Sequence, residues 1–394
     1  MQATMEVTNS RDEAAARRLS HKKVSDLTAE KRRLVEVPYT ASLAHTMNAL
    51  VANRVVAVPV ATPPGHWIGA GGSMILESDK QTGAVRKHYI GMVTMLDILA
   101  HIAGDEIDGA GGVDEIDQRM AVPVSSVIGH CLESLSLWTL NPNTRQVFFY
   151  PLLNSNIAVF SSFIILNCME VFSKGIHRAM VPMDSQMESA AGVELVESAS
   201  SYRMVTQMDL MRFLKSHDDS ELNAIMSRTV SQLGAVKETI FGVTDRTKVI
   251  EAIKAMRTAS LNAVPILRSS SSIPEDHTQL INGRARKLIG TFSATDLREC
   301  PIAQLKSRLP VSVLEFTEKL SVSPAELAAA LDVGAAATPS RELVTCRADS
   351  FLGEVVDKVV TKHVHRVWVV DQLNLLVGLV SLTDIIRVIR LSLL

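Results

Sequence analysis

Four short runs in the sequence pair a hydroxyl side chain with a carboxylate three residues later. They are Thr94 with Asp97, Thr206 with Asp209, Ser293 with Asp296, and Ser381 with Asp384. Each run follows a short apolar stretch, and successive aspartates are 112, 87 and 88 residues apart. A nearly constant interval of small-domain length indicates an internal repeat. The chain is therefore predicted to consist of four related units.

A hydroxyl and a carboxylate at this spacing can serve two purposes. At the start of a helix they form an N-cap with an acidic third residue, which satisfies free backbone N–H groups and complements the helix dipole. At a ligand cleft, the carboxylate can accept two hydrogen bonds from a ribose diol. All four runs have Asp rather than Glu. We expect the shorter side chain to reach back poorly to a cap, so the pattern favours a ligand site, with a purely structural role as the alternative.

Basic residues stand where a helix is expected to return to a strand. They are His177 and Arg178 in the second unit, His365 and Arg366 in the fourth, and Arg54, placed similarly, in the first, while the third unit has Asn262 there. A guanidinium group can hold phosphate oxygens with its planar fork of N–H donors. A solvated strand end is the structural alternative for any one of these residues. Two His-Arg pairs in matching positions favour a phosphate-binding role.

The elements that position these residues can be read from the apolar pattern. Helix-period stripes precede three of the signatures, at Leu43, Thr46, Met47, Leu50 and Val51, at Val249, Ile250, Ile253 and Met256, and at Leu352, Val355, Val356, Val359 and Val360. A β-rich run follows each stripe, then a loop, and then the strand that ends at the hydroxyl. The order helix, strand, hairpin, strand, helix predicts α/β units whose faces need partners.

These observations divide the chain into five parts. They are an N-terminal arm at 1–20, unit one at 21–103, unit two at 104–217, unit three at 218–300 and unit four at 301–394. Unit two is longer because of an apolar segment at about 145–166. Residues 147–166 carry no charge and have the length of a membrane span, but Pro151, Asn154 and Asn156 argue against one. Removing the segment brings the 112-residue interval to about 90, so we interpret it as an insertion.

Composition limits the function further. The net charge is -2, which gives no global field to attract nucleic acid. The four cysteines lack metal-ligand spacing and a disulfide framework, which suits a reducing compartment. The N-terminus lacks an apolar signal core, and Gln2 stands where N-myristoylation requires glycine. We expect a cytoplasmic and/or nuclear protein that binds neither nucleic acid nor membrane. A phosphate loop, a zinc-protease motif and a kinase catalytic loop are absent from the sequence, so an enzyme is not expected.

Taken together, the four units resemble cystathionine-β-synthase-type (CBS) repeats. The set of four is similar to the gamma regulatory subunit of the AMP-activated and plant sucrose-nonfermenting-related protein kinases, over about 21–394. The run 173–182, which contains His177 and Arg178, points to the plant members. The resemblance implies an α/β fold in which units one and two form one paired module and units three and four another. The two modules would make a flat disk with ligand clefts at its centre.

The resemblance also implies a function. It predicts a non-catalytic subunit of a heterotrimeric Ser/Thr kinase in energy and sugar signalling, with a catalytic (alpha) and a beta subunit as partners and AMP, ADP or ATP as regulatory ligand. The implied nucleotide-binding residues are Thr94, Asp97, Thr206, Asp209, Ser293, Asp296, Ser381 and Asp384, with Arg54, His177, Arg178, His365 and Arg366 as basic contacts. The alternatives are a stand-alone CBS-pair regulator that binds adenosyl ligands and a scaffold subunit that has lost nucleotide binding.

One departure from the pattern affects the expected sites. Three residues before the signature hydroxyl, unit two has Arg203 where the other units have Gly91, Gly290 and Gly378. Glycine permits close approach to the backbone, and a bulky side chain there is expected to fill the cleft. We therefore expect units three and four to hold the best-preserved clefts, with Asp296 or Asp384 on ribose and His365 and Arg366 on phosphate.

Overall fold

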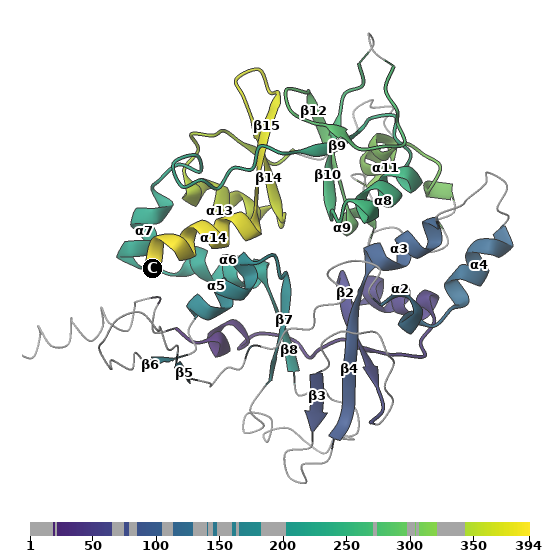
Figure 1. The fold of residues 1–394 in the computed structure, drawn as a ribbon, viewed down its shortest axis with the longest axis horizontal. Helices are drawn as coiled ribbons and strands as arrows, with labels where there is room; N and C mark the ends of the chain where they lie inside the picture. The colour runs from purple at the N-terminus through teal and green to yellow at the C-terminus, as the bar shows by residue number, and fades with distance from the viewer. Residues whose placement is uncertain are drawn as a thin grey trace, which may run out of the picture.

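A computed structural model gives the fold of the chain (Figure 1). It describes residues 19, 22–64, 75–78, 85–104, 113–128, 140, 145–147, 160–162, 165–182, 202–270, 274–297, 304, 307–320 and 343–394. The glycine cluster at 65–72, the segment 141–144 and the alanine-rich stretch at 325–337 lie outside these residues.

Each signature hydroxyl ends a strand, and a helix begins at the next residue. The strand and helix pairs are β4 (Val85–Thr94) with α3 (Met95–Ala103), β8 (Tyr202–Thr206) with α6 (Gln207–Ser216), β12 (Leu288–Ser293) with α9 (Ala294–Leu297), and β15 (Leu376–Ser381) with α14 (Leu382–Leu393). The prediction of four strand-to-helix junctions at Thr94, Thr206, Ser293 and Ser381 is therefore confirmed.

The apolar stripes form the helices that precede the central strands. These helices are α2 (Leu43–Ala52), α5 (Ile165–Ser173), α8 (Val249–Thr258) and α13 (Leu352–Thr361). Their buried positions follow the helical period, as at Leu352, Val355, Val356 and Val359 in α13. The helices predicted from the three stripes are confirmed.

Three of the sheets share one topology. Each has a first strand and a central strand: β1 (Val37–Pro38) with β2 (Ala57–Thr62), β9 (Phe241–Thr244) with β10 (Ala263–Leu267), and β13 (Thr345–Cys346) with β14 (Arg366–Val370). In each pair the two strands are parallel, and the second strand is antiparallel to the signature strand. Unit one adds β3 (Ile75–Ser78) and unit three adds β11 (Ile281–Asn282) at an edge. In unit two, β7 (Arg178–Pro182) pairs with β8 in the same antiparallel way.

Strand register gives an exact correspondence between the units. The first residue of each central strand pairs with the signature hydroxyl: Ala57 with Thr94, Arg178 with Thr206, Ala263 with Ser293, and Arg366 with Ser381. Equivalent positions in the four units can therefore be found by counting from these pairs.

Two kinds of packing assemble the units. Sheet side chains join unit one to unit two, through Tyr89, Met92, Met180 and Tyr202, and unit three to unit four, through a cluster that includes Leu267 and Trp368. Helices join the two pairs to each other. One core combines α2 and α3 with α8, α9 and α11 (Val313–Leu320), and the other combines α5 and α6 with α13 and α14.

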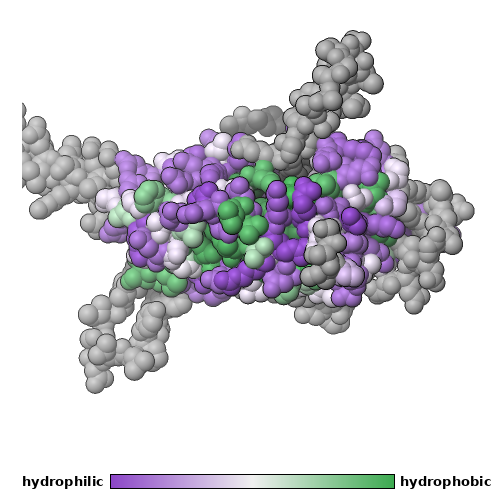
Figure 2. All heavy atoms as spheres, turned by 90° about the horizontal axis from the view of Figure 1, so that it is seen from above, coloured by the Kyte–Doolittle hydropathy of each residue, from purple (hydrophilic) through white to green (hydrophobic). Residues whose placement is uncertain are grey.

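The result is a flattened, disk-like molecule with one unit in each quadrant (Figure 1). Units one and two occupy the lower half of this view, and units three and four the upper half. Seen from above, the described surface is mostly hydrophilic, with a group of hydrophobic side chains near the middle of this face (Figure 2). The architecture agrees with the predicted arrangement of two paired modules in a disk.

The remaining described elements connect the units. They are the 3-10 helices η2 (Val24–Leu27) and η3 (Val124–Val127) and the helices α4 (Val113–Ala121) and α7 (Ser220–Met226). Within the predicted insertion, β5 (Arg145–Val147) pairs with β6 (Phe160–Ser162) in an antiparallel manner. The range 145–166 also includes the first two residues of α5, of which Ile165 is fully buried in the core. In the described part of the chain, no helix combines the length and apolarity that crossing a membrane requires.

Candidate functional site

The four strand-to-helix junctions meet at one central cavity. Its volume is ≈ 260 Å³, close to the lower end of the ~300–1,000 Å³ range of small-molecule sites. All four signature hydroxyls line it, from Thr94, Thr206, Ser293 and Ser381. Sequence positions nearly 300 residues apart are thus brought together because each unit directs the carboxyl end of its signature strand toward the same axis.

The cavity is also lined by both His-Arg pairs. His177 and Arg178 enter from unit two, and His365 and Arg366 from unit four. The Arg366 Nη1 donates to the carbonyl oxygen of Ala263 at 2.7 Å, which holds the guanidinium between units three and four. Imidazole and guanidinium groups beside hydroxyls make this cavity suited to an anion.

The predicted equivalence of Arg54 to these pairs is wrong. Arg54 lies just after the end of α2 with φ +52°, the left-handed conformation that also occurs at Gly175, Ser260 and His363 after the corresponding helices. The residue that corresponds to Arg178 and Arg366 by register is Ala57. Arg54 is not among the residues that line the cavity.

The four signature aspartates lie behind the cavity wall rather than on its lining. Each one is the third residue of its helix and accepts a hydrogen bond at the start of that helix. The Oδ2 atom accepts from the backbone N–H of the signature residue at 2.7 Å for Asp97, 2.8 Å for Asp209, 2.8 Å for Asp296 and 3.2 Å for Asp384. The expectation that Asp reaches back poorly to a cap is therefore wrong, because the three-residue spacing places the short carboxylate directly under the N–H group.

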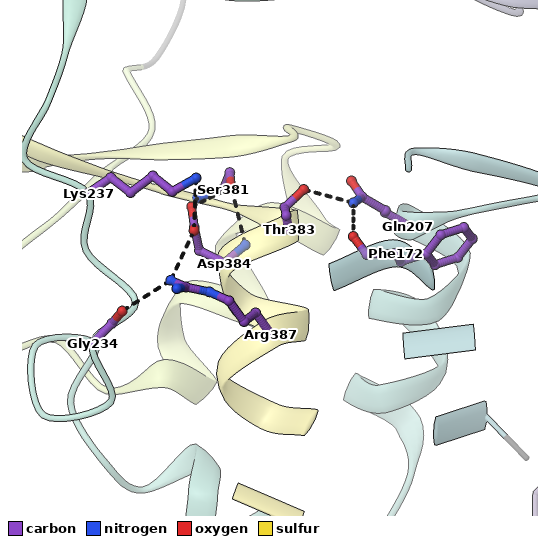
Figure 3. Close-up of polar contacts among 8 residues, drawn as sticks. All are labelled: Phe172, Gln207, Gly234, Lys237, Ser381, Thr383, Asp384 and Arg387. Carbon is purple, nitrogen blue, oxygen red and sulfur yellow. Dashed lines mark hydrogen bonds and ion pairs between the residues drawn. The ribbon is translucent and has the colours of Figure 1, made fainter. Parts of the chain in front are cut away.

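In unit four the carboxylate of Asp384 has donors on both oxygens (Figure 3). Oδ2 accepts from the backbone and the hydroxyl of Ser381, and Oδ1 lies 3.2 Å from the Nζ of Lys237 and 3.3 Å from the Nη2 of Arg387. Arg387 also donates to the carbonyl oxygen of Gly234 at 3.3 Å. Asp384 is fully buried, so these contacts compensate a charge that would otherwise be costly.

Unit two has the same kinds of donor around Asp209, but its lysine contacts the other carboxylate oxygen. The Thr206 backbone and hydroxyl donate to Oδ2, the Nζ of Lys31 lies 2.6 Å from the same oxygen, and the Nη1 of Arg212 lies 3.4 Å from Oδ1. Arg212 stands three residues after its aspartate, as Arg387 does in unit four. Lys31 and Lys237 both belong to the segment before a unit's first strand. We call 28–36 and 234–240 the lead-in segments of units one and three, and 343–344 that of unit four.

The residue three positions before the signature hydroxyl contacts a lead-in segment. At Gly378, a Cβ atom would lie 2.5 Å from Val236 Cγ1 and 3.1 Å from the carbonyl oxygen of Lys237. In unit two, Arg203 is nearly buried, and its Nε donates to the carbonyl oxygen of Lys31 at 3.2 Å. Arg203 therefore packs against the lead-in segment of unit one. In unit four, the lead-in segment at Val236 and Lys237 occupies the space that Gly378 leaves free.

The cleft of unit three is open toward the cavity. Gly290 and Thr291 line the cavity, as do Leu343 and Val344 of the unit-four lead-in segment. The Nε1 of Trp368 donates to the Thr291 hydroxyl at 2.8 Å, which joins unit four to unit three beside the cavity. Among the described residues that line the cavity, none comes from the lead-in segments of units one and three.

A side chain that sequence reasoning missed connects the two modules beside the cavity (Figure 3). The amide of Gln207, the first residue of α6, donates to the Phe172 carbonyl oxygen at 3.0 Å and to the Thr383 hydroxyl at 2.9 Å. Gln207 and Thr383 both line the cavity. Nothing in the local pattern distinguishes Gln207 from an ordinary helix residue, because its partner lies 176 residues away.

Metal and thiol chemistry find little support in the described residues. No group of three or more His, Cys, Asp or Glu side chains that could hold a metal occurs among them. Cys168 and Cys346 are free and buried. Burial raises the pKa of the Cys346 thiol to about 11 and raises the pKa of Cys168 as well. Both thiols therefore stay protonated at neutral pH and are poor nucleophiles.

Comparison with known proteins identifies close relatives over almost the full length. The chain is 55% identical over 95% of its length, and 97% of the relative, to the SNF1-related protein kinase regulatory subunit gamma-like protein PV42a of Arabidopsis thaliana. It is 53% identical over a similar span to PV42b of the same plant. Half of the chain is 21% identical to the bovine 5'-AMP-activated protein kinase subunit gamma-3, over 34% of that protein.

Domain and structure comparisons agree on the fold. Residues 332–391 match the CBS domain family. A solved structure from Methanocaldococcus jannaschii, described as a candidate archaeal homologue of gamma-AMPK, aligns over 93% of this chain and 99% of that one, with a TM-score of 0.54 and 14% identity.

Proposed function

The chain belongs to the family of SNF1-related protein kinase regulatory gamma-like subunits, and on this premise we propose that it is the non-catalytic gamma subunit of a heterotrimeric Ser/Thr kinase. Its partners would be a catalytic (alpha) and a beta subunit, and its task energy or sugar signalling in the cytoplasm or nucleus. The names of the relatives as regulatory subunits support a role without catalysis. The inert, buried thiols support it too.

The proposed ligand is an adenine nucleotide in the central cavity. The observation that carries this proposal is the convergence of four hydroxyls and two His-Arg pairs on one space. Phosphate oxygens would lie between Arg178 and Arg366, because planar guanidinium groups bind them with two parallel hydrogen bonds. The sugar and base would extend into the cleft of unit three, where Leu343 and Val344 offer an apolar wall.

Ligand binding would change the relative position of the two modules and would not catalyse a reaction. The cavity wall combines residues from all four units, so an anion held there contacts both modules at once. A ligand that prefers one relative position of the modules would shift the population of that state. The Gln207 bridge to Thr383 lies in this wall and would report such a shift.

Calorimetry with AMP, ADP and ATP tests the ligand. Arg366→Ala should weaken AMP binding by about 1.5 to 3 kcal/mol, since a charged hydrogen bond to phosphate is lost, and Arg178→Ala should do the same. Lys254→Ala, at a partly exposed lysine of α8 that pairs with Glu251, is the matched control for loss of one positive charge. Unchanged affinity in both arginine variants would contradict a phosphate site here and favour a scaffold that has lost nucleotide binding.

A pull-down with the tagged full chain tests the partners. We expect co-purification of a kinase catalytic subunit and a beta subunit from plant extract, identified by mass spectrometry. A chain that recovers neither partner but binds an adenosyl ligand in calorimetry would instead be a stand-alone CBS-pair regulator.

A further inference from the structure

Gln207 is polar at a position where the other three units have an apolar residue. It directly follows the signature hydroxyl, and the equivalent residues are Met95, Ala294 and Leu382. In all four units the backbone N–H at this position donates to the carbonyl oxygen of the residue just before the central strand, at 2.9 to 3.1 Å. Gln207 is 5% exposed, and a buried amide costs free energy unless its groups are hydrogen-bonded. The contacts of this side chain must therefore account for it.

Two acceptors fix the orientation of the Gln207 amide (Figure 3). Its Nε2 donates to the Phe172 carbonyl oxygen at 3.0 Å and to the Thr383 hydroxyl oxygen at 2.9 Å. A backbone carbonyl can only accept, so the nitrogen and not the oxygen of the amide must face Phe172. The two protons of the amide are both used by these contacts. The hydroxyl oxygen of Thr383 is therefore the acceptor in its bond with Gln207.

This direction of bonding leaves the proton of the Thr383 hydroxyl for another partner. A hydroxyl group donates one hydrogen bond and can accept two. Within the described part of the chain, no acceptor for the Thr383 proton occurs, and Thr383 lines the central cavity. A ligand in the cavity could therefore accept a hydrogen bond from Thr383.

The neighbouring signature hydroxyls have their protons bound within the chain. Thr206 donates to its own aspartate, Asp209, and Ser381 donates to Asp384. Each of these hydroxyls also accepts from the backbone N–H of that aspartate. Because a hydroxyl has a single proton, neither one can donate to an anion while its cap is intact. Thr383 can donate where these two neighbours cannot.

We propose that Gln207 is a positioning residue of the nucleotide site, which holds the Thr383 hydroxyl so that Thr383 donates to a phosphate oxygen of the ligand. This inference rests on the proposed nucleotide function and adds one contact to it. The bond crosses between the modules, because α6 of unit two packs against α14 of unit four. Arg178 and Arg366, the proposed phosphate contacts, come from the same two units. Units two and four would thus bind the phosphate jointly.

Calorimetry of the full chain with AMP, at fixed ionic strength, tests this contact. Thr383→Val removes the hydroxyl at nearly constant shape and should weaken AMP binding about tenfold or more, since a hydrogen bond to a charged group is lost. Thr383→Ser keeps the hydroxyl and should retain the wild-type affinity. The matched control is Thr361→Val, because Thr361 also accepts from a side chain of unit two, Lys215, but does not line the cavity. Its AMP affinity should equal that of the wild type.

Gln207→Met removes the amide, keeps the length of the side chain, and introduces the residue type that unit one has at this position. It should weaken AMP binding at least about threefold, because the Thr383 hydroxyl is no longer held. In the Thr383→Val background the same change should have no further effect, since no hydroxyl is left to position. Thermal unfolding of each variant establishes that the chains are folded at the temperature of the binding measurement.

The outcomes separate the role of Gln207 from the proposed function. An equal loss from Gln207→Met with threonine or valine at position 383 would mean that Gln207 only joins the helices, and would overturn the proposal. AMP binding that is unchanged in Thr383→Val and in Gln207→Met, while Arg366→Ala weakens it, would also overturn the proposal and would leave the nucleotide function standing. A wild-type chain that binds no AMP would refute the function itself, and with it the ligand of Thr383.

Discussion

Units three and four share a topology and a register, yet different residues surround the equivalent glycines Gly290 and Gly378. In unit three, Gly290 and the lead-in residue Val344 border the central cavity. In unit four, the lead-in segment lies against Gly378, and Lys237 contacts the buried Asp384. The sheets pair in the same way, from Ala263 with Ser293 in one and Arg366 with Ser381 in the other. A few side chains, not the fold, therefore distinguish the two repeats.

The two units also contribute different side chains to the cavity. Unit four supplies the basic side chains His365 and Arg366, whereas unit three has Asn262 and Ala263 at the same register positions. Arg366 reaches across to the Ala263 carbonyl oxygen. The positive charge that unit three meets at the cavity thus comes from unit four.

Replacing the buried carboxylate should have the largest effect on stability. Asp384→Ala removes a helix cap worth about 1 kcal/mol and charged hydrogen bonds worth about 1.5 to 3 kcal/mol. We expect the free energy of unfolding to fall by about 2 to 4 kcal/mol, measured by urea denaturation. The control is Asp357→Ala on the exposed face of α13, which should cost less than about 1 kcal/mol. Equal losses would mean that the contacts of the buried Asp384 add no more stability than those of an exposed aspartate.

A methyl group at Gly378 should separate the lead-in segment from unit four. Its Cβ would meet Val236 and the Lys237 carbonyl oxygen, so Gly378→Ala should cost about 1 to 3 kcal/mol through overpacking. Gly353→Ala, in α13 of the same unit, meets nothing closer than 3.4 Å and should be neutral or stabilising. Thermal unfolding of the two variants compares them directly. If Gly378→Ala is as stable as the wild type, the lead-in segment can move away from residue 378 without cost, and the expected overpacking is absent.

Removing Lys237 should change stability least. Asp384 is fully buried, but Lys237 is more than half exposed, so water can take the place of its ammonium while Arg387 stays on the same carboxylate oxygen. The cost should then stay near the range of about 0.2 to 1 kcal/mol for exposed ion pairs. We expect Lys237→Ala to unfold within about 1 kcal/mol of the wild type, with the difference shrinking at high salt as screening weakens the pair. A loss as large as that of Asp384→Ala would mean that water cannot replace the lysine at the carboxylate.

The sequence predicts the features that are local. The ends of the four signature strands and the buried faces of α2, α8 and α13 follow from patterns within one unit. Two local inferences were wrong for geometric reasons. Arg54 adopts a left-handed conformation after its helix, so its position must be counted from the strand register, and Asp reaches its cap because of the helix geometry.

Features that depend on distant residues could not be predicted. Lys31 and Lys237 look like ordinary surface lysines in the sequence, and their aspartates lie in other units. The convergence of His177 and Arg178 with His365 and Arg366 on one cavity was available only through the resemblance to CBS proteins. The interpretation of Gly378 as room for a ligand failed for the same reason, since the segment that fills this room is more than a hundred residues earlier.

AMP affinity in two isosteric variants tests the difference between the clefts most directly. Asp296→Asn and Asp384→Asn each remove one signature charge, in the open and in the closed cleft, and both can be measured by calorimetry at a temperature where the chains are folded. The open cleft of unit three predicts that Asp296→Asn weakens AMP binding at least about tenfold, or 1.4 kcal/mol, while Asp384→Asn stays within about twofold of the wild type. Loss of binding in Asp384→Asn with normal binding in Asp296→Asn would contradict it.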